Sequence, residues 1–239
     1  MKKAVFIISI LVFIILNFNA CRKHECPPVP EKTSATSSPT ILTLQPDAAI
    51  GKDATIWYIQ SQTTPQGVTN TLNFGSDMEL PSMAWTFDGW PGYKQSLIQF
   101  DLSTVPASAI ITSAQLTLYD CTGCVDDNLG EEGGLMGDSN KAIIQRITSA
   151  WQENTVTWDS KPSVTTQNQV IIPSDTSFPI KTTVIDVTSL VQDMVANPTS
   201  SFGFLFSQQV ASPDRSMVFA SSDHSNAALH PKLMVQYNK

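Results

Sequence analysis

Charge of either sign is scarce in this sequence, and positive charge is the scarcer. Only 15% of the 239 residues are charged, and 14 Lys and Arg face 21 Asp and Glu, which gives a formal net charge of −7. Non-specific nucleic-acid binding requires a basic excess that displaces counterions from phosphates, so we expect no nucleic-acid partner. Disorder is also unexpected, because 41% of the residues are hydrophobic and disordered chains are poor in apolar residues.

The sequence also lacks the common catalytic motifs. It contains no Gly-x-Ser-x-Gly, no His-Glu-x-x-His, no phosphate-binding loop and no Gly-x-Gly-x-x-Gly. Its three histidines, His24, His224 and His230, show no metal-ligand spacing. The two carboxylates of a glycosidase are defined by their distance in space, and no pair stands out in the sequence. We therefore expect a protein without catalytic activity, with a polysaccharide lyase or hydrolase as the less favoured alternative.

One long hydrophobic run is present, and it stands at the N-terminus. Two lysines precede an apolar run over residues 4–16, which is too short to span a membrane comfortably and is typical of a signal peptide. Ala20 and Cys21 follow, as in a bacterial lipobox, where the cysteine is acylated. We predict a lipoprotein signal peptide over residues 1–20 and lipidation of Cys21. Plain secretion and an uncleaved anchor are the alternatives.

Residues 21–39 are rich in proline, serine and threonine and show no apolar period, a composition typical of a flexible tether. Residues 40–239 are expected to form one domain, because no repeat or internal boundary interrupts them. These features predict a cell-envelope protein, lipid-anchored at the outer membrane or the cell surface, or otherwise secreted. We expect membrane contact only through the lipid. The sequence leaves the oligomeric state open.

Within the domain, apolar residues recur at period two rather than at the helical period. Nine short runs are rich in β-branched or aromatic residues and are separated by Gly, Pro, Asn, Asp and Ser, which predicts a sandwich or a barrel. The runs cover residues 41–44, 54–60, 96–102, 114–119, 141–147, 180–187, 202–207, 216–220 and 232–237.

One short helix is predicted near residue 190. Four apolar residues share a helical face there, Thr188 or Ser189 can cap the start, and Pro198 follows the end. The face consists of Leu190, Val191, Met194 and Val195.

The cysteines offer little chemistry. Cys121 and Cys124 form a Cys-Thr-Gly-Cys segment that can close a small disulfide in an oxidising compartment. A zinc site needs four ligands, but Cys21 is assigned to the lipid and Cys26 to the tether. We expect a local disulfide or free thiols, with redox or metal chemistry as the less favoured alternative. The acidic, glycine-rich residues 126–138 fail the EF-hand pattern and are expected to form a solvated loop.

Several blocks of the sequence resemble a known family. They are GKDATI (51–56), NFG (73–75), SLIQFDLS (96–103), IITSAQLTLY (110–119), ITSAWQENTVTW (147–158), KP (161–162), DVT (186–188), FGF (202–204), SSD (221–223) and PKL (231–233). From about residue 40 to the C-terminus, the chain resembles the DNRLRE-type domain, also classed as carbohydrate-binding module family 96. The resemblance implies an all-β fold, a single jelly-roll-like β-sandwich, on a secreted bacterial protein that binds polysaccharide. In the longest block, Trp151 and Trp158 are expected to pack in the core.

Members of this family are linked to acidic glycans such as alginate, but Gln95 and Gln99 stand where the family often carries arginine. Glutamine cannot make the charged bidentate pair that arginine makes with a uronate. Residues 40–239 hold nine basic and 19 acidic residues, a net charge of −10, which disfavours a polyanion. The expected partner is a neutral or acidic polysaccharide, with a neutral glycan at least as well supported. A structural or adhesive surface domain that contacts proteins is the alternative function.

Aromatic side chains are the candidates for sugar contacts, because sugar rings present apolar C–H faces. Trp85, Trp90 and Tyr93 lie in residues 81–93, whose prolines and glycines predict a loop. Together with Trp57, which stands in a predicted strand, they are the predicted ligand-binding residues. The alternatives are that the loop plugs the edge of the sandwich or contacts a protein.

A structural ion is common in jelly-roll modules of this general kind. The positions in the matching blocks that offer oxygen ligands for calcium are Asp53, Asn73, Gly75 and Asp223. The alternative is that Asp53 and Asp223 cap turns through local hydrogen bonds. No cofactor is expected to be required.

Overall fold

The computed structural model describes residues 38–61, 68–124, 140–175, 181–212 and 215–239. The predicted signal peptide, Cys21 and most of the predicted tether lie outside these ranges, as does the acidic segment 126–138. None of the described helices has the length and apolar content needed to cross a membrane.

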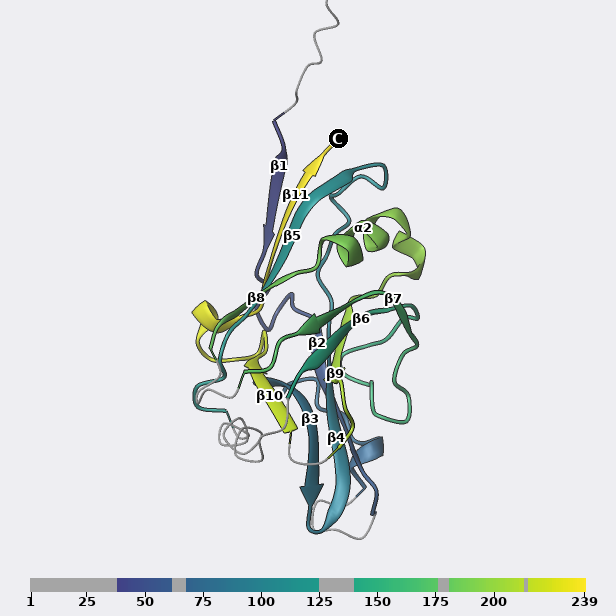
Figure 1. The fold of residues 1–239 in the computed structure, drawn as a ribbon, viewed down its shortest axis with the longest axis vertical. Helices are drawn as coiled ribbons and strands as arrows, with labels where there is room; N and C mark the ends of the chain where they lie inside the picture. The colour runs from purple at the N-terminus through teal and green to yellow at the C-terminus, as the bar shows by residue number, and fades with distance from the viewer. Residues whose placement is uncertain (1–37, 62–67, 125–139, 176–180, 213–214) are drawn as a thin grey trace, which may run out of the picture. The chain divides into compact units, whose positions relative to one another are not determined.

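The described chain folds into two antiparallel β-sheets and one α-helix, which confirms the predicted all-β class (Figure 1). The smaller sheet has the strand order β1-β11-β5-β8, and the larger has the order β10-β3-β4-β9-β6-β7, with β2 also paired to β4. The strands are β1 Thr40–Leu44, β2 Asp53–Ile59, β3 Glu79–Phe87, β4 Trp90–Ile98, β5 Ile110–Leu118, β6 Ala142–Ile147, β7 Val164–Ile172, β8 Thr183–Asp186, β9 Phe204–Gln208, β10 Arg215–Ala220 and β11 Lys232–Asn238. The helix is α2, Thr188–Ala196, and the short 3-10 helices are η1 Thr69–Thr71, η2 Pro198–Ser200 and η3 Ala227–Leu229.

The main hydrophobic core joins the two sheets. Leu116 and Val235 contribute to it from the smaller sheet, and Ile98, Ile144 and Phe204 contribute from the larger one, all with no exposed surface. Each fully buried side chain of this size stabilises the fold by about 1.5–3 kcal/mol before conformational entropy is counted. Since neither sheet can cover its apolar face alone, the sandwich is the arrangement that removes both faces from water.

The helix α2 has the predicted buried face but a different start. Leu190, Val191, Met194 and Val195 are buried, and the helix packs against β5. No side chain caps the helix at its N-cap residue; instead, the carboxylate of Asp186 accepts a hydrogen bond from the Thr188 N–H at 2.9 Å. The Thr188 hydroxyl accepts a hydrogen bond from the Ala114 N–H at 2.9 Å, which ties the first turn to β5.

The segment 81–93 was predicted to be a loop, and this prediction is wrong. It forms most of β3 and the start of β4, which pair as a hairpin. The turn residues Asp88 and Gly89 have φ angles of +48° and +84°, the left-handed conformation that a two-residue Asp-Gly turn requires. One of the prolines that suggested a loop still takes part in the sheet. The Pro91 carbonyl accepts a hydrogen bond from the Gln60 N–H at 2.9 Å.

The strand β4 changes its neighbour along its length. Its first half pairs with β3 and its second half pairs with β9, because the start of β3 crosses over one face of the larger sheet. At the crossing, the Ser96 hydroxyl donates to the Pro81 carbonyl at 2.7 Å, and the Thr55 hydroxyl donates to the Glu79 carbonyl at 3.2 Å. The crossing therefore brings side chains of β2, β3 and β4 together on that face.

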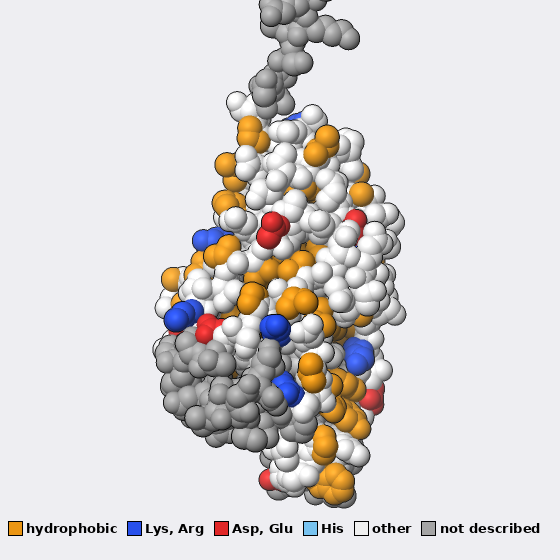
Figure 2. Space-filling view, in the orientation of Figure 1, with side chains coloured by type: hydrophobic (Ala, Val, Ile, Leu, Met, Phe, Trp, Pro, Cys, Tyr) orange, Lys and Arg blue, Asp and Glu red, His pale blue; other side chains and the backbone are white. Residues whose placement is uncertain are grey.

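Charged side chains are sparse in the sequence and on the face of the described residues that Figure 2 shows. The face of the molecule in Figure 2 carries scattered lysine, arginine and acidic side chains and no large patch of either sign. A polyanion would need such a basic patch to overcome the net negative charge of the domain.

Candidate functional site

The four aromatic residues that the sequence analysis selected do not share one surface. Tyr58 and Tyr93 lie opposite one another in the β2–β4 pair, and side chains alternate between the two faces along a strand. Trp57 therefore projects from the other face of the larger sheet. Trp85 and Trp90 project from the same face as Trp57 by the register of the β3–β4 pair. Tyr93 is thus separated from the other three.

Two of these residues have different environments although they belong to one hairpin. Trp90 lies next to the turn and is 46% exposed. Trp85 is half-buried and packs against a small cluster that contains Met83, Val218 and the pair Cys121 and Cys124. Trp85 therefore covers the edge of a small core. This agrees with the alternative prediction that residues 81–93 plug the edge of the sandwich.

Tyr93 belongs to a group of three aromatic side chains, which we call the aromatic patch: Tyr58, Tyr93 and Trp158. Their ring centroids are 5.4 to 6.3 Å apart in all three pairs, and their planes lie within 26° of parallel. Three rings in one straight stack would place the outer pair about twice as far apart as the neighbours, so these rings form a compact triangle. Each is half-buried, and the Lys161 ammonium lies 3.9 Å from the centroid of the Trp158 ring.

The connection between β6 and β7 holds Trp158 in this position. Trp151, in the same connection, is buried as predicted, and its indole N–H donates to the Phe202 carbonyl at 2.8 Å. Asp159 accepts a hydrogen bond from the Asn70 side chain at 2.8 Å. Trp158 itself, which was expected in the core, packs only at the edge of the cluster around Trp151. The patch is therefore anchored on both sides of Trp158 by fixed contacts.

A second candidate site is an acidic cluster formed by Asp53, Glu153 and Asp223. One carboxylate oxygen from each lies within 4.8 Å of the others. The cluster is bound into the backbone, since Asp53 accepts a hydrogen bond from the Ser222 N–H at 3.0 Å and its own N–H donates to Glu153 at 2.9 Å. Asp53 is only 1% exposed.

Burial raises the pKa of all three carboxyl groups, and repulsion between carboxylates adds to the shift at Asp53 and Glu153. Burial raises the pKa of Asp53 to about 6, and the charges of Asp223 and Glu153 act in the same direction, whereas hydrogen bonds from Ser222 oppose the shift. Burial and the charge of Asp223 raise the pKa of Glu153, partly offset by Lys52. Burial also raises the pKa of Asp223, partly offset by the charge of His230. Nearby positive charge therefore offsets the raised pKa values of Glu153 and Asp223 only in part.

Asn73 and Gly75, which were predicted as ligands with Asp53 and Asp223, have a different place. The Asn73 side-chain amide donates to the Glu153 carbonyl at 2.7 Å and to the Val156 carbonyl at 2.8 Å. A Cβ atom on Gly75 would stand 2.2 Å from the Glu153 carbonyl oxygen, so only glycine fits there. The two residues hold the backbone of Glu153, the third carboxylate, which the sequence analysis did not select.

The donor set of the acidic cluster suits a hard cation. Calcium takes six to eight oxygen ligands, and carboxylates are its main protein ligands. A divalent cation among the three carboxylates would offset their buried negative charge, including the repulsion that adds to the raised pKa values of Asp53 and Glu153. The residues present therefore fit the calcium ion that the sequence analysis named beside the turn-capping alternative, with Glu153 in place of Asn73 and Gly75.

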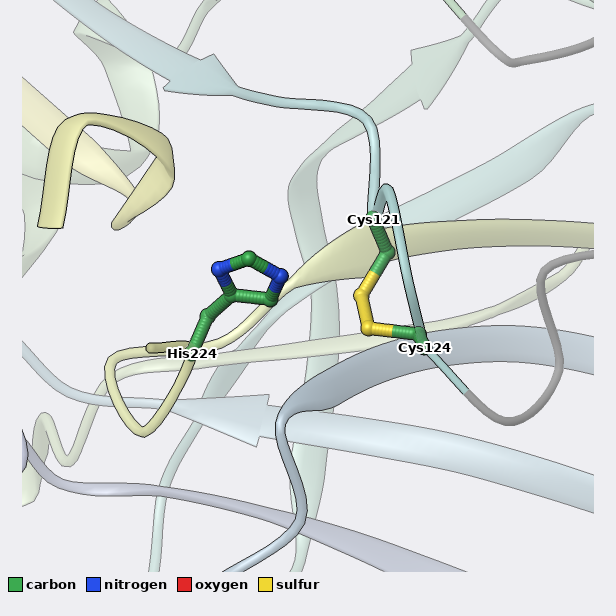
Figure 3. A group of neighbouring side chains, drawn as sticks. All are labelled: Cys121, Cys124 and His224. Atoms are coloured by element: carbon green, nitrogen blue, oxygen red, sulfur yellow. A yellow bond between two sulfur atoms is a disulfide. The ribbon is translucent and has the colours of Figure 1, made fainter. Parts of the chain in front are cut away.

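A third group combines Cys121, Cys124 and His224 (Figure 3). The two cysteines form a disulfide, which settles the alternatives left open by the sequence. The Nδ1 atom of His224 accepts a hydrogen bond from the Asn226 N–H at 3.1 Å, so Nε2 carries the proton and donates to the Thr122 carbonyl at 3.2 Å. Both ring nitrogens and both sulfur atoms are engaged, and the group joins two loops rather than offering ligands.

Comparison with known proteins bears on the function of these sites. The profile of carbohydrate-binding module family 96 matches residues 51–237, which begin two residues before β2 and end within β11. The chain belongs to this family. No curated protein matches the chain significantly. The match therefore identifies the domain as a carbohydrate-binding module.

The aromatic patch was only partly predictable from the sequence. Tyr93 was selected, but Tyr58 was passed over as the neighbour of Trp57, and Trp158 was assigned to the core. Tyr58 stands in a predicted strand, but Tyr93 stands in the segment that was predicted to be a loop, so their pairing was not expected. No local signal brings Trp158 to Tyr58 across 100 residues of chain.

Proposed function

We propose that this carbohydrate-binding module binds a polysaccharide outside the cytoplasm, without catalysis, and that the glycan lies on the aromatic patch of Tyr58, Tyr93 and Trp158. The observation that carries the proposal is the group of three half-exposed, nearly parallel rings beside the Lys161 ammonium. Aromatic faces match the apolar C–H faces of sugar rings, and a rigid ring loses little conformational entropy on binding. The ammonium supplies three hydrogen-bond donors for hydroxyl groups.

The first experiment is an array of neutral and acidic polysaccharides probed with the purified protein, followed by calorimetry on the best ligand. Trp158→Ala should weaken binding about 5- to 150-fold, by analogy with a base stacked on an aromatic side chain. Trp90→Ala is the matched control, since Trp90 is an exposed tryptophan on the opposite face of the larger sheet. If Trp90→Ala lost affinity and Trp158→Ala did not, the glycan site would lie at the turn of the β3–β4 hairpin instead of at the aromatic patch. Absence of any glycan ligand would favour the structural or adhesive alternative.

Attachment to a membrane through Cys21 is a separate part of the proposal. It is supported by the two lysines, the apolar run and the Ala20-Cys21 pair in the sequence. Cys21→Ser should give an unprocessed chain that takes up no labelled fatty acid and runs larger on a gel. Equal labelling of the wild type and the variant would contradict lipidation.

Calcium at the acidic cluster is the third part. We propose that Asp53, Glu153 and Asp223 hold a structural calcium ion, which ties together the start of β2, the β6–β7 connection and the β10–β11 loop. The support is the short distances between the three carboxylates and the direction in which their pKa values are shifted. The ion would stabilise the domain on which the aromatic patch is built, and it would not contact the patch residues.

A further inference from the structure

A cavity of about 330 Å³ opens on the face of the larger sheet opposite the aromatic patch. Its lining includes Trp57 and Phe74 as aromatic walls and Asp77, Glu79 and Lys94 as charged groups. It lies where the start of β3 crosses β2 and β4. We call it the ion-pair pocket.

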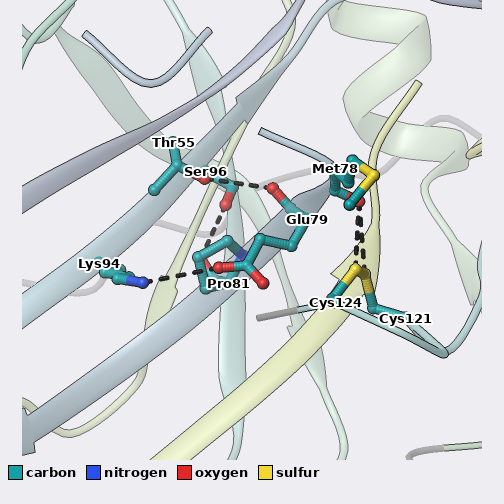
Figure 4. Close-up of polar contacts among 8 residues, drawn as sticks. All are labelled: Thr55, Met78, Glu79, Pro81, Lys94, Ser96, Cys121 and Cys124. Atoms are coloured by element: carbon teal, nitrogen blue, oxygen red, sulfur yellow. Dashed lines mark hydrogen bonds and ion pairs between the residues drawn. A yellow bond between two sulfur atoms is a disulfide. The ribbon is translucent and has the colours of Figure 1, made fainter. Parts of the chain in front are cut away.

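The ion-pair pocket contains two charged side chains that are almost completely buried. Lys94 and Glu79 have side chains that are 9% and 7% exposed, and their charged atoms lie 3.6 Å apart (Figure 4). The Lys94 ammonium also lies 4.7 Å from the centroid of the Trp57 ring. A buried ion pair is weak evidence for stability, because desolvation can exceed the attraction between the charges. Its presence at the wall of an open cavity points to a role in recognition.

The indole of Trp57 contributes a second polar group to the wall of the pocket. Its ring is fixed against Phe74 at 5.7 Å and Phe87 at 5.2 Å between centroids. Its Nε1 atom is buried, and within the described residues it has no hydrogen-bond partner. A buried N–H without an acceptor is unfavourable, so a ligand oxygen placed there would recover a hydrogen bond that the protein alone does not make.

We propose that the ion-pair pocket binds one neutral sugar unit of a glycan, a pyranose whose hydroxyls serve the buried polar groups. The proposal rests on the proposed function, since it names a sugar as the ligand, and it adds a second site on the other face of the sheet. A sugar hydroxyl both donates and accepts hydrogen bonds, so it can serve the Trp57 N–H, the Lys94 ammonium and the Glu79 carboxylate alike. The aromatic walls match the apolar faces of the ring.

Size and charge narrow the ligand class. A volume of about 330 Å³ stands at the lower end of the range for small-molecule sites, roughly 300–1,000 Å³, which suits one sugar unit rather than a chain. The lining carries the two carboxylates Asp77 and Glu79 against the one ammonium of Lys94, so its formal charge is negative. A uronate would bring a further carboxylate into this field, and a neutral pyranose avoids that repulsion.

The test uses the indole N–H signals of the protein in proton–nitrogen correlation spectra. The sequence has five tryptophans, so five signals are expected, and Trp57→Phe identifies the one from Trp57. The probes are the methyl glycosides of glucose, galactose and mannose and of the corresponding uronic acids. The Trp57 signal should shift with at least one neutral glycoside, and the matching uronate should bind at least tenfold more weakly. If no neutral glycoside shifts the Trp57 signal, or if a uronate binds as tightly, the proposal is wrong.

A variant tests the role of the ion pair. Glu79→Gln keeps the shape of the side chain and removes its charge, so it should weaken the neutral glycoside about tenfold or more and reduce the discrimination against the uronate. The other four indole signals report whether the variant remains folded. If Glu79→Gln remains folded and binds the neutral glycoside as the wild type does, the ion pair has no role in recognition. If the variant does not fold, the pocket proposal is judged on whether the Trp57 signal of the wild type shifts with a neutral glycoside.

Trp158→Ala separates the two proposals. The variant lacks one ring of the aromatic patch and should leave the Trp57 response to the glycoside intact. Loss of polysaccharide binding in Trp158→Ala without any glycoside shift at Trp57 would overturn the pocket alone. A Trp57 response together with unchanged polysaccharide binding in Trp158→Ala would overturn the patch alone.

Discussion

Two groups of three potential metal ligands share one loop and differ in how far the protein satisfies them. Asp223 and His224 are neighbours in the β10–β11 loop, yet Asp223 belongs to the acidic cluster and His224 to the cysteine group. In the cysteine group, a disulfide and two imidazole hydrogen bonds occupy the donor atoms. In the acidic cluster, burial raises the pKa of all three carboxyl groups, and repulsion between carboxylates adds to the shift at Asp53 and Glu153. The same loop thus contributes to one group whose donor atoms are already occupied by the protein and to one whose negative charge a cation would offset.

The largest expected effect concerns the charge of Asp53. Its pKa is about 6 in the folded protein and 3.8 by its ordinary value, so the folded state binds the proton more tightly. Stability from this group is therefore present below pH 4 and is lost as the pH rises towards and past 6, by about 3 kcal/mol. In calcium-free buffer, urea unfolding of the wild type should show this loss relative to Asp53→Asn between pH 4 and pH 7. Parallel pH profiles of the two proteins would contradict the assignment.

Calcium should have the next largest effect and should act on the acidic cluster only. At a calcium concentration one hundred times the dissociation constant, binding stabilises the folded state by about 2.7 kcal/mol. For a domain of this size, that corresponds to a rise in Tm of about 5–10 °C, measured by calorimetry at pH 7. Asp53→Asn should lose most of the rise. Asp88→Asn, at the exposed turn between β3 and β4, is the matched control and should keep it.

A smaller effect is expected at the cysteine group. The disulfide closes a loop of four residues, for which chain entropy predicts a stabilisation of about 2 kcal/mol. Replacing Cys121 and Cys124 together by alanine should lower the free energy of unfolding in urea by this amount. A loss below about 0.5 kcal/mol would show that the packing of the loop, and not the bond, holds it in place.

The smallest effect, and the sharpest contrast with calcium, is expected from zinc. The oxidised protein offers no thiolate at the cysteine group, and both nitrogens of His224 are engaged, so zinc should cause no rise in Tm that depends on His224. The measurement is a melt of the oxidised wild type with zinc and without calcium. A zinc-dependent rise that His224→Ala abolishes would mean that the group is a metal site after all.

Much of the fold was accessible from the sequence, because period-two patterns and helical faces are local. The strands around Ile56, Leu116 and Val235 and the buried face of α2 were predicted and are present. The strand β7 was missed because five of its nine residues, Thr165 to Gln169, are polar and most of the strand is exposed. The hairpin of β3 and β4 was missed because its prolines and glycines outweighed the Asp-Gly turn signal.

The candidate sites could be predicted from the sequence only in part, because some of their residues are recognised by type and others only by long-range contacts. The sequence by itself determined the all-β class, the family blocks and the presence of carboxylates at Asp53 and Asp223, since these depend on residue type and local period. Only the tertiary structure decided that Glu153 joins them and that Trp158 meets Tyr58 and Tyr93. Those meetings depend on where the long β6–β7 connection folds back on the sheet, and the contact between Asp53 and Glu153 spans 100 residues of chain. Such contacts form when the two sheets pack, and no local preference in either segment encodes them.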